Sequence, residues 1–172
     1  MLEGIGNTGC ARMLTGVLRY LVRIPEGWTP DPNSKEASRP ILFVHGLGMG
    51  LAQYATLLNY FSTNPTLKSR PIMVLIQPSI SMAFFSRGYL DPPDMQSSTA
   101  GIRRAAERHG FDKSGLTVLS HSNGTIVHGW LIKQAPELCK RNCLVDPVTF
   151  CLWEPWGEHS LTYNLDVGCE SR

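Results

Sequence analysis

The chain has 172 residues, of which 42% are hydrophobic and 17% charged. This composition is typical of one folded domain with a sizeable core and excludes a disordered segment. Sixteen Lys and Arg residues against 14 Asp and Glu residues give a formal net charge of +2. A charge this balanced argues against nucleic acid or an anionic membrane surface as the main partner.

The cysteines and the hydropathy of the chain bound its chemistry and its location. The five cysteines form no C-x-x-C pair, and no Cys/His set has zinc spacing, so no metal site is predicted. Their odd number and the lack of a secretory signal predict a reducing, cytoplasmic location. No stretch approaches the ~20 apolar residues of a membrane span, so none is predicted.

Residues 1–37 are predicted to be an N-terminal segment and loop. Within residues 14–21, four apolar side chains recur at helical spacing, which favours a short amphipathic helix. The β-branched content of the same stretch leaves a strand as the alternative. Residues 25–39 are rich in Pro, Ser and charge, which indicates a loop.

Four continuous apolar runs follow, as strands buried on both faces require. They are residues 41–44, 72–76, 116–119 and 143–145. Helical patterns lie between them, at residues 51–61, 94–108 and 124–134. Strands that alternate with helices predict βαβ units, and therefore an α/β fold with a parallel sheet flanked by helices on both sides.

The third apolar run leads directly into the sequence SHSNGT, residues 120–125, and then into an apolar helix. This context matches the nucleophile elbow, a sharp turn with small residues two positions before and after the nucleophile. Ser120 stands where the pattern usually has its first glycine. The elbow interpretation predicts that Ser122 is a nucleophile at a helix N-terminus, where developing negative charge is favoured. An ordinary turn between strand and helix is the alternative.

The first apolar run ends in the glycine-rich sequence HGLGMG, residues 45–50. Acyl transfer needs two N–H donors aimed at the oxyanion, which the pattern assigns to the backbone of Leu47 and Asn123. The alternative, a phosphate-binding loop, is disfavoured because no Lys-Ser/Thr follows and no clean G-x-G-x-x-G is present. His45 is predicted to be a structural hydrogen-bonding residue rather than a general base.

These two motifs, in this order and spacing, resemble the α/β-hydrolase superfamily over residues 38–155, in particular fungal serine hydrolases of the AB hydrolase-1 type. The resemblance implies a three-layer αβα fold with a mostly parallel sheet. It also implies hydrolysis of carboxylic or lipid esters through an acyl-enzyme on Ser122, a small-molecule substrate and no cofactor. Residues 81–85 are candidates to line an acyl pocket, with core packing as the alternative. A non-catalytic α/β-hydrolase-like binding domain or fragment is the alternative function.

The other triad members would follow Ser122 in the order acid, then histidine. Asp146, after the fourth apolar run, is the candidate acid; alternatively it turns the chain together with Pro147. His159 is the only histidine beyond it, although the superfamily's base normally follows one or two further strands. Residues 156–172 lack periodicity and are predicted to be an irregular tail. The sequence therefore predicts a chain truncated before its last strands, with little or no esterase activity.

Overall fold

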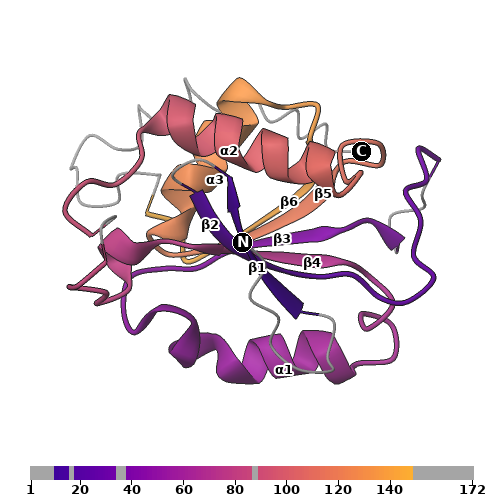
Figure 1. Cartoon of the computed structure of the whole chain (residues 1–172), viewed down its shortest axis with the longest axis horizontal. Helices are drawn as coiled ribbons and strands as arrows, with labels where there is room; N and C mark the ends of the chain where they lie inside the picture. The colour runs from indigo at the N-terminus through magenta and orange to yellow at the C-terminus, as the bar shows by residue number, and fades with distance from the viewer. Residues whose placement is uncertain (1–9, 16–17, 34–37, 87–88, 149–172) are drawn as a thin grey trace, which may run out of the picture.

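The computed structural model describes residues 10–15, 18–33, 38–86 and 89–148. Within them lies a six-stranded sheet of order β1-β2-β4-β3-β5-β6. Helix α1 covers one face of the sheet, and α2 and α3 cover the other (Figure 1). The elements are β1 (Cys10–Thr15), β2 (Leu18–Arg23), β3 (Ile41–Val44), α1 (Ala55–Thr63), β4 (Ile72–Ile76), α2 (Met95–Arg108), β5 (Leu116–His121), α3 (Gly124–Gln134) and β6 (Cys139–Val145).

The four strands predicted from apolar runs pair in parallel: β3 with both β4 and β5, and β5 with β6. All four residues of β3 are buried, as a central strand covered on both faces requires. The α/β class with a mostly parallel sheet is therefore confirmed. Strand β6 begins four residues before its predicted start, and its side chains are mostly exposed because it lies at the edge of the described sheet.

The N-terminal segment adds two antiparallel strands to the same sheet. Strand β1 pairs with β2, and β2 pairs with β4. In β2, Leu18, Tyr20 and Val22 are buried while the residues between them are only half-buried. This two-residue period places one face of β2 in the core, and it outweighs the helical spacing of residues 14–21. The helix prediction for that stretch is wrong, and the strand alternative is correct at the described positions.

The predicted helices are present with small changes at their ends. Helix α3 has the predicted bounds, and α2 begins after Asp94, whose carboxylate accepts the N–H of Ser97 at 2.7 Å. Residues 50–54 form a 3₁₀ helix that leads into α1. No helix of the described residues is long and apolar enough to cross a bilayer.

Two apolar clusters lie on the two faces of the sheet. The larger joins β2 to α2 and α3 through buried side chains such as Tyr20, Ile102 and Leu131. The smaller packs Phe43 of β3 against Phe61 of α1. Both clusters hold β3 and β5 in place, so the loops after these two strands leave a rigid sheet at a common edge.

Candidate active site

Ser122 occupies the sharp turn between β5 and α3, at the carboxyl edge of the parallel strands. Its φ is +49°, a left-handed conformation that side-chain-bearing residues rarely adopt. The Ser122 N–H donates to the carbonyl oxygen of Val145 at 2.9 Å. The Ser122 carbonyl accepts from the N–H of Thr125 at 2.9 Å and from its hydroxyl at 2.7 Å. Ser122 therefore lies in a sharp strand–turn–helix junction, and its role as a nucleophile stays a prediction.

Two glycines let the elbow and the loop after β3 pack backbone to backbone. A Cβ added at Gly46 would lie 3.0 Å from the Cβ of Ser122. A Cβ added at Gly124 would lie 2.5 Å from the carbonyl oxygens of Val44 and His45. The small-residue requirement of the motif therefore has a direct steric cause on its C-terminal side.

On the N-terminal side of the motif, Ser120 has a partner that a glycine would lack. Its fully buried hydroxyl lies 2.7 Å from Nδ1 of the buried His128 of α3. The other ring nitrogen of His128, Nε2, lies 2.8 Å from Oδ1 of Asn142 in β6. Because Asn142 Oδ1 only accepts, Nε2 carries the proton and Nδ1 accepts from Ser120. This chain of bonds ties β5, α3 and β6 together beneath the elbow.

The predicted oxyanion donors lie in the two loops that the glycines bring together. Leu47 follows Gly46, and Asn123 follows Ser122 and precedes α3. The next N–H in the first loop, that of Gly48, donates to the carbonyl oxygen of Ile80 at 3.0 Å. Among the described residues, no acceptor is found for the N–H of Leu47 or Asn123. Their role as donors to a substrate stays a prediction.

His45 is buried and structural, as predicted. Its Nδ1 lies 2.8 Å from the carbonyl oxygen of Gly46, and its Nε2 accepts the N–H of Gln77 at 3.2 Å. Burial lowers the pKa of His45, although the bond to Gly46 opposes that shift. With both ring nitrogens occupied, His45 joins the loops after β3 and β4 rather than serving Ser122 as a base.

Asp146 directly follows β6, at the same edge of the sheet as Ser122, which directly follows the neighbouring strand β5. Its φ is +48°, and the residue is exposed. Both alternatives for Asp146, triad acid and turn residue, therefore stay open. His159 and the predicted tail 156–172 lie outside the described residues.

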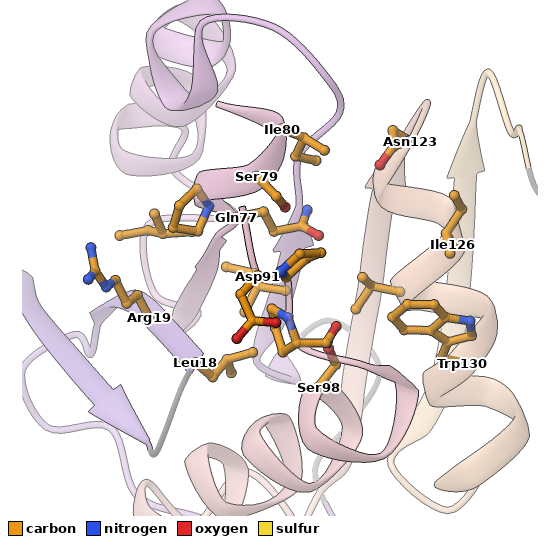
Figure 2. Close-up of a pocket in the computed structure, with 16 residues that line it drawn as sticks. Leu18, Arg19, Gln77, Ser79, Ile80, Asp91, Ser98, Asn123, Ile126 and Trp130 are labelled. Carbon is orange, nitrogen blue, oxygen red and sulfur yellow. The ribbon is translucent and has the colours of Figure 1, made fainter. Parts of the chain in front are cut away.

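A cavity of about 680 Å³ opens beside the elbow. It lies between Ile126 and Trp130 of α3 and the first residues of β2, with Asn123 above them (Figure 2). Ser122 is not part of its lining, but the neighbouring Asn123 is. Most of the lining is apolar, and the polar groups come from Arg19, Gln77, Ser79, Asp91, Ser98 and Asn123.

The large apolar side chains of residues 81–85 do not pack in the core, and their role in an acyl pocket stays a prediction. Met82 and Phe84 are about 60% exposed, and Phe85 is fully exposed, so they are not core residues. They are also absent from the lining of the cavity. The cavity is lined instead by residues of β2, of β4 and the segments after it, of α2 and of α3. These segments are far apart in the sequence, and the spacing of the apolar runs does not predict that they meet.

Two residues that the sequence did not single out also meet at the site. The Tyr54 hydroxyl lies 2.7 Å from Nδ1 of His121, the residue before Ser122, and it accepts the N–H of Gly46 at 2.9 Å. The only sequence signal was the position of His121 inside the elbow. Within the described part of the chain, no group of three or more His, Cys, Asp or Glu residues could hold a metal ion.

No family model matches the sequence, and no curated protein matches it. Solved structures do match. Cfl2 from Burkholderia cenocepacia is 15% identical with a TM-score of 0.56, over 86% of this chain and 45% of that one. An epoxide hydrolase from Aspergillus niger is 18% identical with a TM-score of 0.55, over 78% and 33%. A predicted CIB-like hydrolase from Thermoplasma acidophilum is 17% identical with a TM-score of 0.53, over 86% and 63%.

These similarities show that the chain has the α/β-hydrolase fold. The chain spans between 33% and 63% of the length of these three structures. At identities below 20% the likeness concerns the fold, and the chemistry has to be argued from the residues of the site.

Proposed function

We propose that this chain supplies the nucleophile and the oxyanion-binding loops of a serine hydrolase that acts on carboxylic or lipid esters. The observation that carries the proposal is the backbone of Ser122, a non-glycine residue at φ +49° between a buried strand and a helix. Such a conformation costs ~1–3 kcal/mol and is retained where the position of a side chain matters. A turn without a function would favour glycine there.

In this proposal the general base takes the proton of the Ser122 hydroxyl as its oxygen attacks the ester carbonyl, and then gives that proton to the leaving alcohol. The resulting oxyanion accepts hydrogen bonds from the N–H groups of Leu47 and Asn123, the alcohol leaves, and water releases the acid from the acyl-enzyme. The close contact between Gly46 and Ser122 supports this assignment, because it brings the two donor loops together. Asp146 is the proposed acid, since it directly follows β6, the strand that pairs with β5 before the elbow.

The general base is a histidine that the described residues do not supply. The described histidines are at positions 45, 109, 121 and 128, and each bonds to a group other than the Ser122 hydroxyl. His159, the histidine outside the described residues, is therefore the candidate for the base in this chain. A serine site without its base keeps only ~10³–10⁴-fold catalysis over water, so weak ester turnover by this chain would indicate that His159 does not serve Ser122.

The cavity beside Asn123 supports an apolar group in the substrate. Its volume of about 680 Å³ is within the usual range for ligand sites, and Trp130 with its aliphatic neighbours makes it mostly apolar. An acyl chain or an apolar alcohol would gain from burial there, at about 0.8 kcal/mol for each CH₂ group.

A fluorophosphonate probe tests the nucleophile directly. We expect slow labelling of the 172-residue chain at Ser122, located by peptide mass spectrometry, and no labelling of Ser122→Ala. Ser62→Ala is the matched control, because Ser62 is an exposed serine of α1 that does not line the cavity, and it should label like the wild type. His159→Ala, assayed in parallel, tests whether that histidine contributes.

The contrasting outcome is a folded wild-type chain that never reacts at Ser122. That result would reject the hydrolase proposal and favour the alternative, a non-catalytic domain of this fold that uses the cavity to bind a ligand. Circular dichroism of each sample separates loss of reactivity from loss of structure.

A further inference from the structure

Hydrogen bonds through Tyr54 connect the loop after β3 with the elbow after β5. The Gly46 N–H donates to the Tyr54 oxygen at 2.9 Å, and Tyr54 Oη lies 2.7 Å from His121 Nδ1. Gly46 precedes Leu47, and His121 precedes Ser122. Each end of this series of hydrogen bonds is therefore one residue away from a group assigned to the reaction.

The bonds of Tyr54 favour one tautomer of His121. The Gly46 N–H can only donate, so the Tyr54 oxygen accepts it. Among the described residues His121 Nδ1 is the one other partner of Tyr54, and the tyrosine hydroxyl proton is bonded within the protein only if Nδ1 accepts it. A neutral imidazole that accepts at Nδ1 carries its own proton at Nε2.

Ring contacts on Tyr54 restrict the position of its hydroxyl group. The Tyr54 ring contacts Phe43 edge to face, with centroids 5.0 Å apart, and contacts the His121 ring in the same way at 5.7 Å. Gly46 leaves no room for a shift, because an added Cβ there would lie 3.0 Å from His121 Nδ1. The hydroxyl is therefore fixed between the two loops.

We propose that His121 is a substrate-binding residue that donates its Nε2–H to an oxygen of the substrate or product, and that Tyr54 is the positioning residue that sets this tautomer. The inference rests on the proposed function for the identity of the ligand, a carboxylic ester and the carboxylate formed from it. His121 is half-buried, and Nε2 has no acceptor among the described residues, so its N–H is available to a ligand. In this role His121 is a donor and not the base of Ser122.

The test of the tautomer uses protein labelled with ¹⁵N-histidine at about pH 8.5, above the usual titration range of histidine. We expect the two-bond ¹H–¹⁵N spectrum to show His121 protonated at Nε2. Tyr54→Phe keeps the ring and removes the hydroxyl, and the Nδ1-protonated form should then appear. Tyr60→Phe is the matched control, because Tyr60 is an exposed tyrosine of α1, the helix that Tyr54 precedes, and it should leave His121 unchanged. An unchanged tautomer in Tyr54→Phe would overturn the role of Tyr54.

The test of the donor role titrates octanoate into the same samples. We expect the His121 Nε2 resonance to shift and saturate, while His109, at the end of α2, does not move. His121→Gln, which retains a donor, should keep octanoate affinity within about threefold, and His121→Leu should lose roughly tenfold, the effect of one hydrogen bond. No shift at His121, or equal losses in both variants, would overturn the donor role. Since octanoate binding needs no reaction at Ser122, failure of the fluorophosphonate labelling would reject the hydrolase proposal separately.

Discussion

Replacing Gly124 with alanine is expected to destabilise the chain by about 3 kcal/mol or more. The added Cβ would lie 2.5 Å from the carbonyl oxygens of both Val44 and His45. These are backbone atoms at the end of β3, a central strand paired on both sides, so they cannot move aside cheaply. The first turn of α3 would have to shift, and with it the elbow that carries Ser122.

Urea denaturation followed by circular dichroism measures this loss as a lower midpoint at unchanged slope. Gly27→Ala is the control for backbone conformation alone, because Gly27 has a φ of +73° and an added Cβ would meet nothing within 4 Å. That variant should lose only about 1 kcal/mol. If Gly124→Ala lost no more than Gly27→Ala, the close packing between the elbow and β3 would be refuted.

The buried centre of the fold could be predicted from the sequence because burial on both faces leaves a distinct pattern. The runs at 41–44 and 72–76 are uninterrupted apolar segments, and both are strands with those bounds. Helix α3 was equally clear, since Pro136 follows it and a sharp strand–serine–helix turn precedes it. In these places local pattern and tertiary environment agree.

The N-terminal strands and the polar contacts of the site could not be predicted in the same way. Residues 14–21 satisfy a helical period and contain strand-forming residues, and only pairing with β4 decides between the two. Tyr54 and His121 are 67 positions apart in the chain, and neither belongs to a motif that requires the other. In residues 81–85 the chain turns at Met82, at φ +52°, and the large apolar side chains of Met82, Phe84 and Phe85 are exposed, which their apolar character does not predict.

The serine at position 120, where the motif usually has a glycine, is explained by a contact that only the structure shows. The sequence pattern treats it as a tolerated substitute for glycine. The structure gives its hydroxyl a buried partner in His128, which in turn reaches Asn142 of the edge strand. A glycine at 120 would leave the imidazole with an unsatisfied acceptor, so this serine and this histidine depend on each other.

Replacing His128 with alanine is accordingly expected to cost about 3 kcal/mol of folding free energy. The change removes a fully buried imidazole and leaves a cavity. It also leaves the buried hydroxyl of Ser120 without an acceptor. His128→Gln should cost less, because glutamine has a similar length and can both accept from Ser120 and donate to Asn142. Urea denaturation of the three proteins at neutral pH gives this ranking, and equal stability of wild type and His128→Ala would contradict it.

The same histidine makes the fold sensitive to acid. Burial lowers the pKa of His128 below its usual value near 6.5, although the bond to Asn142 opposes the shift. Between the two pKa values the unfolded chain binds the proton and the folded chain does not, so the free energy of unfolding falls as the pH drops below about 6.5. Burial also lowers the pKa of His45 and His109, so the three histidines act in the same direction. His128→Gln removes one of the three groups, and we therefore expect its stability to decline less steeply than that of the wild type between neutral pH and pH ~5. Parallel curves for the two proteins over that range would show that His128 does not bind its proton more weakly in the folded state.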